Sequence, residues 1–202
     1  MQRSVMIVDD FLTEPERFRE AAARMDFPEQ DGNFPGRNSL QRLDLPELDK
    51  AVENLVGQKL RPLRNLSHGK FRLTLAGDIG RGKVHLDDSQ WSGILYLSLP
   101  EHCEGGTEFF RHKATGTESL LLRKNQMDAL GWAGPDEANA AISDIIERDG
   151  TRDEAWEPTL NVPMRYNRLL LLRPWQWHTA GPGFGTSLED GRLVFLLFYA
   201  RA

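Results

Sequence analysis

Short strand-like segments separated by turns fill most of the chain after residue 62, and this pattern constrains the fold most strongly. Residues 71–75 alternate with a period of two, and residues 93–99 place apolar side chains on both faces before a proline stops them. The segments 167–173 and 192–199 are almost continuously apolar, as expected of strands covered on both sides. This succession predicts a sheet-on-sheet core, either a sandwich or a jelly roll.

Before these strands, the chain has a mixed character. Residues 5–8 are typical of a short buried strand, and apolar residues then recur at helical spacing up to Pro28. A second helix is predicted over residues 46–60. Between the two helices, residues 26–45 are rich in Gly, Pro, Asn and Asp, which predicts a loop long enough to act as a lid over a site.

The length of 202 residues corresponds to about one domain. We expect a single domain over residues 1–202, in which residues 1–66 form a strand and helices packed on the core. Residues 67–202 are then the core, with a helical insertion near 135–148 where apolar residues are again grouped at helical spacing. The predicted class is mainly β with flanking helices (α+β), and the core is a double-stranded β-helix, or jelly roll.

Charge and cysteine content restrict the partners and the compartment. The net charge of −5 gives no reason to expect nucleic acid as a partner, because phosphate binding requires clustered positive charge. Basic residues gather only between Arg61 and Arg72, either as a solvated face or as a contact for an anionic substrate. Cys103 is the single cysteine, which excludes an intrachain disulfide, and the apolar stretch Val5–Val8 is too short to cross a membrane. We expect a cytoplasmic protein without membrane association.

Two short motifs predict a metal site. His85 and Asp87 are two residues apart in a predicted strand over residues 83–87, so their side chains share a face and lie roughly 6–7 Å apart along the chain. His178, in the C-terminal quarter, is the candidate third ligand. Two histidines and one carboxylate are the ligand set of non-haem iron(II) oxygenases. The alternatives are that His85 is a polar strand residue and that His178 packs beside neighbouring tryptophans.

The segment from Phe71 to Tyr199 resembles the double-stranded β-helix core of iron(II)/2-oxoglutarate-dependent dioxygenases, and within them the prolyl-4-hydroxylase-like branch. The order and spacing of four pieces carry the resemblance: His85-Leu86-Asp87, the strand from Gly93 to Ser98, Gly105-Gly106-Thr107-Glu108-Phe109, and the stretch from Asn167 through His178 to Val194.

This resemblance implies iron(II) and 2-oxoglutarate as cofactors, with ascorbate as a candidate accessory reductant. It implies that His85, Asp87 and His178 hold the metal and that Arg192 grips the far carboxylate of 2-oxoglutarate, which suits the planar fork of a guanidinium. Tyr96 matches a tyrosine that in relatives donates its hydroxyl to the same carboxylate; the alternative is an aromatic side chain packed in the sheet. Arg72 and Arg173 also lie near strands and compete for the clamp.

The implied reaction is hydroxylation of an amino acid, a peptide or a small metabolite, with decarboxylation of 2-oxoglutarate to succinate. Related halogenases have a small residue in place of the carboxylate ligand, whereas Asp87 is present here. Two alternatives stay open: a zinc-dependent hydrolase on the same ligands, in which Arg192 has no role, and a cupin-like module that binds or senses a metal or small acid without turnover. The sequence leaves the substrate and the oligomeric state open.

Overall fold

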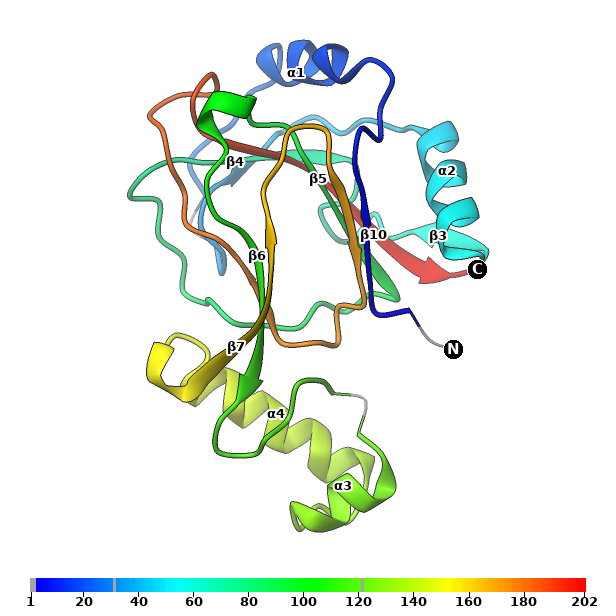
Figure 1. Cartoon of the computed structure of the whole chain (residues 1–202), viewed down its shortest axis with the longest axis vertical. Coiled ribbons are helices and arrows are strands. Elements are labelled where there is room, and N and C mark those ends of the chain that lie inside the picture. The colour runs from blue at the N-terminus through cyan, green and yellow to red at the C-terminus, as the bar shows by residue number, and fades with distance from the viewer. Residues whose placement is uncertain (1–2, 31, 121) are drawn as a thin grey trace.

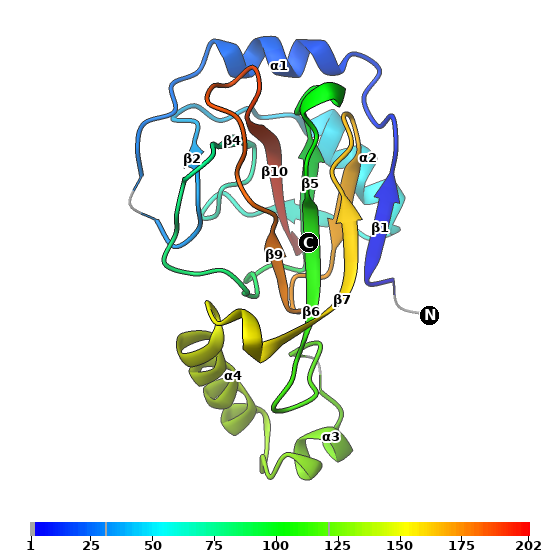
Figure 2. The ribbon, with the colours of Figure 1, turned by 60° about the vertical axis from the view of Figure 1, so that its left-hand side comes forward.

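Two antiparallel β-sheets form the body of the molecule in the computed structural model, which describes residues 3–30, 32–120 and 122–202 (Figures 1 and 2). The larger sheet has the order β1 (Val5–Val8), β8 (Leu169–Leu172), β5 (Trp91–Tyr96), β10 (Arg192–Arg201), β4 (Lys70–Thr74) and β2 (Arg37–Asn38), and β3 (Leu60–Pro62) pairs with the end of β10. The smaller sheet has the order β7 (Trp156–Pro163), β6 (Gly106–His112) and β9 (His178–Ala180). The predicted sheet-on-sheet core is therefore present.

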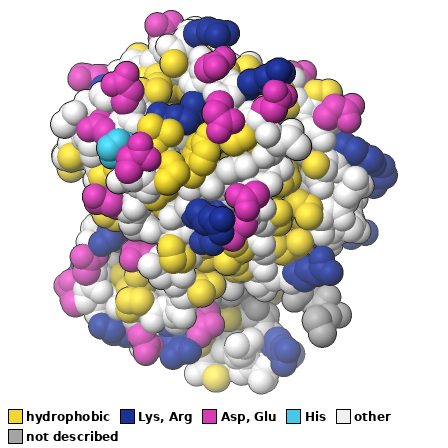
Figure 3. All heavy atoms as spheres, turned by 45° about the horizontal axis from the view of Figure 1, so that its top comes forward, with side chains coloured by type: hydrophobic (Ala, Val, Ile, Leu, Met, Phe, Trp, Pro, Cys, Tyr) yellow, Lys and Arg dark blue, Asp and Glu magenta, His cyan; other side chains and the backbone are white. Residues whose placement is uncertain are grey.

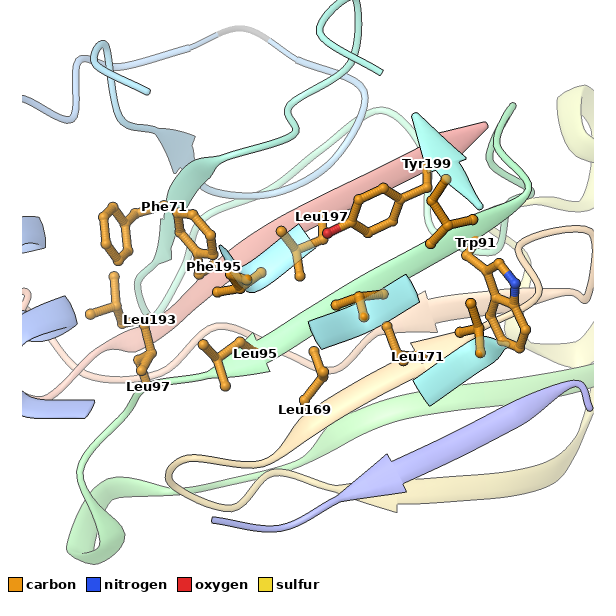
Figure 4. Packing of buried hydrophobic residues seen from close by; sticks show 14 of the residues in the cluster. Phe71, Trp91, Leu95, Leu97, Leu169, Leu171, Leu193, Phe195, Leu197 and Tyr199 are labelled. Carbon is orange, nitrogen blue, oxygen red and sulfur yellow. The ribbon is translucent and has the colours of Figure 1, made fainter. Parts of the chain in front are cut away.

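The continuous apolar runs are buried on both faces of the larger sheet. On β8, Leu169 and Leu171 point into an outer core, whereas Leu170 and Leu172 point toward the smaller sheet. Strand β10 alternates in the same way, and Figure 4 shows its outer-core side chains beside those of β5 and β8. Because successive side chains of a strand point to opposite faces, both faces of this sheet need apolar residues.

Helices cover the outer face of the larger sheet. Helix α1 (Pro15–Ala23) and helix α2 (Pro46–Val56) contribute apolar side chains to the outer core. The predicted end of the second helix at residue 60 is wrong, because Gly57 adopts a left-handed conformation with φ of 67° and terminates α2. Leu60 instead begins β3.

The end of the molecule opposite α1 carries helices α3 and α4 (Figure 2). Helix α4 (Pro135–Asp149) confirms the helix predicted over residues 135–148, and α3 (Lys124–Ala129) precedes it. Two short 3₁₀ helices, Pro100–His102 and Asp153–Ala155, follow β5 and α4. Within the described ranges, no helix combines the length and apolar character needed to cross a membrane.

Some local predictions are wrong. Residues 83–87 do not form a strand; one isolated bridge joins His85 to His178. The apolar run predicts that Asn167 lies in a strand, but its φ of 60° places it in a turn, and β8 begins at Leu169. The predicted loop over residues 26–45 contains the short strand β2, which pairs with β4.

The outer surface mixes charge types. Figure 3 shows the face that carries α1, where acidic and basic side chains are interspersed among apolar ones. Several of these charges lie on or beside α1, where Arg17 contacts Glu14 at 2.9 Å and Arg24 contacts Glu20 at 3.6 Å. Exposed pairs of this kind contribute little to stability, so α1 is held mainly by its apolar side chains, such as Ala22 and Phe18, against the sheet.

Candidate metal centre

Three side chains that lie far apart in the sequence converge at one point. One ligand atom each from His85, Asp87 and His178 can be chosen so that all lie within 4.8 Å of one another. Nε2 of His85 is 3.5 Å from Oδ1 of Asp87, and Nε2 of His178 is 3.5 Å from Oδ2 of the same carboxylate. The structure thus brings together the three residues predicted as a site.

Backbone pairing places these side chains. His85 donates its N–H to the carbonyl of His178 at 3.0 Å, and His178 returns a bond of 3.2 Å to the carbonyl of His85. The N–H of Asp87 donates to the carbonyl of Pro174 at 3.1 Å. The segment is therefore extended although it is not a strand, so the two-residue spacing still puts His85 and Asp87 on the same side.

Hydrogen bonds orient each of the three groups. Nδ1 of His85 lies 2.9 Å from the carbonyl oxygen of Lys83, and Nδ1 of His178 lies 2.8 Å from that of Gln176. Because a carbonyl oxygen can only accept, each Nδ1 carries a proton, and Nε2 is the ring nitrogen that faces Asp87 and can bind a metal. The hydroxyl of Ser92 donates to Oδ2 of Asp87 at 2.7 Å and fixes the plane of the carboxylate.

The electrostatics favour a cation at the point of convergence. Burial raises the pKa of the Asp87 carboxyl, but the contacts with His178 and His85 together lower it by more, so that the pKa lies well below its ordinary value. Asp87 is accordingly ionised at neutral pH. The two Nε2 atoms and the carboxylate would repel one another without a positive charge between them, and either a proton on an imidazole or a metal cation provides that charge. The donor set of two nitrogens and one carboxylate suits a divalent transition metal such as iron(II).

The metal centre opens into a cavity that also contains Arg192. The cavity has a volume of about 690 Å³ and lies between the inner face of the larger sheet and the loops that carry the triad. Arg192 begins β10 and is 2% exposed. Its Nε and Nη2 atoms have no hydrogen-bond partner among the residues that the structure describes. Burial lowers the pKa of this guanidinium. A buried cation without a partner is costly, and an anionic group in the cavity would relieve that cost.

The two competing arginines are already engaged by the protein. Arg72 lines the cavity but donates to the carbonyls of Phe34 and Pro35, each at 2.6 Å from Nη2. The guanidinium of Arg173 lies over the ring of Trp91 at 3.9 Å and is not part of the cavity wall that the described residues form. Among the three arginines, Arg192 is therefore the one with donors, Nε and Nη2, that no described residue engages and that an anion could use.

The structure places Tyr96 in the protein interior, close to Arg192. It is fully buried, and its hydroxyl is 2.7 Å from Oγ1 of Thr107. Burial raises the pKa of this phenol, and the charge of Arg192 acts in the opposite direction. Tyr96 is close enough to Arg192 for the charge to act on it, but it does not belong to the cavity wall formed by the described residues. A role for Tyr96 toward 2-oxoglutarate stays a prediction.

Two contributors to the site were not identified from the sequence. Ser92 holds Asp87, and the ring of Phe34 lies against that of His85 with 4.0 Å between centroids. Phe34 belongs to the loop predicted over residues 26–45, and residues 33–35 of that loop line the cavity. The loop composition indicated a lid, but no local signal shows which of its residues covers the metal centre.

Comparisons with known proteins agree with this fold. The model of a family described as "Family of unknown function (DUF6445)" matches residues 1–198. No curated protein matches the chain by sequence. Among solved structures, HygX from Streptomyces hygroscopicus with nickel and 2-oxoglutarate bound is 15% identical with a TM-score of 0.57, and the match covers 98% of this chain and 83% of that chain.

Two further structures from nogalamycin biosynthesis are similar. The non-haem α-ketoglutarate-dependent epimerase SnoN is 16% identical with a TM-score of 0.56, and the match covers 98% of this chain and 79% of that chain. The carbocyclase SnoK is 13% identical with a TM-score of 0.55, covering 99% and 80%. These similarities confirm the predicted fold, the jelly-roll core of the 2-oxoglutarate-dependent oxygenases.

Proposed function

We propose that this chain, which belongs to the DUF6445 family of unknown function, is an iron(II)- and 2-oxoglutarate-dependent dioxygenase. The observation that carries the proposal is the presence, in one cavity, of the convergent triad His85, Asp87 and His178 together with the buried Arg192, whose Nε and Nη2 atoms lack a partner among the described residues. A metal site and a fixed cation in the same cavity suit a ligand that is anionic at one end and chelating at the other.

The residues of the site have separate roles in this proposal. His85, Asp87 and His178 hold iron(II), and Ser92 keeps the carboxylate of Asp87 in its orientation through a bond of 2.7 Å. Arg192 binds the far carboxylate of 2-oxoglutarate with the donors that lack a partner in the described part of the chain. The cosubstrate is thereby oriented before the chemical step.

The inner wall of the cavity has an apolar part beside Arg192. Its apolar side chains come from three neighbouring strands of the larger sheet: Ile94, Leu172, Val194 and Leu196. The burial of Arg192 beside this apolar wall strengthens its interaction with a carboxylate, because the local dielectric constant is low. The ring of Phe34 packs on that of His85 and limits access to this ligand.

The overall reaction that we propose is balanced by one molecule of dioxygen. Iron(II), when bound, supplies the redox chemistry by which dioxygen oxidises 2-oxoglutarate to succinate and carbon dioxide and the substrate gains the second oxygen atom. Hydroxylation of a small metabolite, an amino acid or a peptide is the expected outcome, and Asp87 in the ligand set favours it over halogenation.

Similar structures support this proposal. HygX was solved with nickel and 2-oxoglutarate, and also with hygromycin B in addition. SnoN and SnoK are both described as α-ketoglutarate-dependent. A small-molecule substrate for the present chain follows that pattern. A zinc hydrolase on the same ligands would leave the buried charge of Arg192 without a function, so this alternative is less favoured.

Succinate formation tests the proposal. The protein is incubated with iron(II), 2-oxoglutarate, ascorbate and air, and succinate is measured with and without a panel of small metabolites, amino acids and peptides. We expect succinate from the wild type, increased by a substrate, and none from His178→Ala. The matched control is His102→Ala, since His102 is half-buried on a 3₁₀ helix and does not line the cavity. Metal binding without succinate under any condition would favour a binding module instead.

A further inference from the structure

Two basic side chains of β4, Lys70 and Arg72, point into the cavity. Lys70, Arg72 and Thr74 pair with Leu196, Val194 and Arg192 of β10, respectively. Directly paired residues of antiparallel strands point to the same face, and all six residues line the cavity. The basic run noted in the sequence between Arg61 and Arg72 therefore ends inside the site rather than on a solvated face.

The cavity wall carries an excess of positive charge. Its charged side chains in the described part of the chain are five cations and two carboxylates: Arg42, Arg64, Lys70, Arg72, Arg192, Asp87 and Asp88. If the proposed function holds, on which this inference rests, the charges of iron(II), 2-oxoglutarate, Asp87 and Arg192 sum to zero. Four cations and one carboxylate then remain around the space for the substrate.

Three of these four cations are committed to the protein. Arg64 pairs with Asp44 at 2.7 Å. Arg42 donates to the backbone carbonyls of Arg64 and Leu66, each at 3.1 Å. Arg72 donates to carbonyls of the loop that covers the site.

Lys70 is the exception. Its ammonium group has no hydrogen bond or ion pair with any residue in the ranges that the structure describes, although the side chain is half-buried. An ammonium group in this position keeps all three of its donors for a ligand.

Lys70 and Arg192 serve different parts of the cavity. Lys70 pairs with Leu196, which is four residues from Arg192 along β10 and points to the same face. The backbone positions of the two cations are therefore about 13 Å apart along the strands. This separation exceeds that of the two carboxylates of 2-oxoglutarate. Lys70 instead lies in the same row as Leu196 and Ile94, one row from Ser92, which contacts Asp87. It therefore faces the end of the cavity nearest the metal centre.

The surroundings of Lys70 favour an amphipathic anion. Ile94, Leu172, Leu196 and Phe198 form an apolar surface beside its charge. The interior also disfavours cations, since burial, and then the charge of Arg192, lower the pKa of Arg72 to about 10. A ligand with a positive group would add to this repulsion, whereas a negative group would relieve it.

From this geometry we propose that the substrate carries a carboxylate or phosphate group, which Lys70 binds, on an apolar body that lies against Ile94, Leu196 and Phe198. Both groups present negatively charged oxygen atoms, and the ammonium group of Lys70 can donate hydrogen bonds to either of them. The substrate class is therefore an organic acid or phosphate ester with a small apolar body rather than a neutral or basic molecule.

Four probes with the same six-carbon chain test this inference: hexanoate, hexyl phosphate, 1-hexanol and hexylamine. Their dissociation constants are measured by isothermal titration calorimetry with the protein loaded with nickel(II) and 2-oxoglutarate, and again with the metal-free protein. We expect both anionic probes to bind the wild type at least about tenfold more tightly than hexanol, with hexylamine weakest. Lys70→Met should weaken the anions about tenfold or more and leave hexanol unchanged, whereas Lys70→Arg should retain them.

The matched control is Lys124→Met, because Lys124 is an exposed lysine of α3 outside the cavity, and this change should alter none of the four affinities. Equal binding of hexanoate and hexanol, unchanged anion binding in Lys70→Met, or no binding of either anion would overturn the inference. Tighter binding of hexyl phosphate or of hexanoate identifies the head group.

Failure of the proposed function gives a different result. In that case 2-oxoglutarate does not bind the wild type, while Lys70-dependent binding of the anions to the metal-free protein persists. Lys70→Met should bind 2-oxoglutarate normally, which separates the two cations of the cavity.

Discussion

Replacement of Arg192 by methionine should stabilise the metal-free protein and at the same time abolish tight binding of 2-oxoglutarate. Arg192 is 2% exposed, and its Nε and Nη2 atoms lack partners within the described chain. Its charge is thus desolvated without compensation until an anion binds. Methionine has a comparable length and fits an apolar wall formed by neighbours such as Val194.

The two expected effects have different magnitudes. Removal of an uncompensated buried charge should raise the free energy of unfolding of the metal-free protein by at least about 1 kcal/mol, which corresponds to about 2–4 °C in Tm for a chain of this size. Loss of one partner of a buried charge pair costs about 2–5 kcal/mol, so the Kd of 2-oxoglutarate should increase by roughly 30-fold to several thousand-fold.

Two measurements check the prediction. Urea unfolding of the metal-free proteins gives the change in stability, and calorimetric titration of nickel(II)-loaded proteins with 2-oxoglutarate gives the change in affinity. Arg173→Met is the matched control, because Arg173 is also buried but lies over Trp91 at 3.9 Å and donates to the carbonyl of Gln90 at 2.9 Å. This control should lose stability and keep its affinity for 2-oxoglutarate.

The opposite pattern would refute the reasoning. If Arg192→Met loses stability and still binds 2-oxoglutarate like the wild type, the guanidinium has a structural role and another group holds the carboxylate. Equal effects of the Arg192 and Arg173 variants on affinity would also contradict the assignment, because then neither arginine is specific to the ligand.

Three further predictions concern the ligands and the loop before β10. Asp87→Ala should abolish iron binding and succinate formation, and retained turnover would remove Asp87 from the site. Ser92→Ala should weaken metal affinity about 10–100-fold with an unchanged circular dichroism spectrum, because the bond of 2.7 Å to Asp87 is lost; an unchanged metal Kd contradicts this role. The backbone N–H of Thr186 and further hydrogen bonds from Ser187 lower the pKa of Asp190 from its ordinary value of 3.8 to about 2. The ionised Asp190 therefore stabilises the fold fully above about pH 4, and this stabilisation is lost as the pH falls through 2. Asp190→Asn should therefore lower Tm at neutral pH and lose less Tm than the wild type between pH 4 and 2, and parallel Tm profiles would disprove this.

The central strands could be predicted well from the sequence, because their apolar character is continuous and local. Leu169–Leu172 and most of the run from Arg192 to Tyr199 are buried on both faces, and an unbroken apolar run of this length is typical of a strand covered on both sides. Strand β7 (Trp156–Pro163) was missed because most of its side chains are exposed and it contains two prolines. Its pairing with β6 depends on a partner more than forty residues away, which periodicity does not reveal.

The candidate site was predictable only in part. The spacing of His85 and Asp87 identified two ligands, although the strand expected there is a single bridge with His178, formed by long-range contacts. Ser92 and Phe34 were missed because their positions relative to the ligands follow from the folded chain alone. Likewise, the basic run was visible in the sequence, but only the pairing of β4 with β10 places Lys70 in the cavity. The cytoplasmic location and the single-domain organisation stay predictions.

An anaerobic titration of the metal-free protein, first with iron(II) and then with 2-oxoglutarate, tests the proposed function most directly. In the wild type we expect a visible iron-to-2-oxoglutarate charge-transfer band that saturates with added cosubstrate, that is absent from Asp87→Ala, and that requires far more 2-oxoglutarate in Arg192→Met. If iron binds to the wild type and no band forms at any 2-oxoglutarate concentration, the protein is not an oxygenase of this kind.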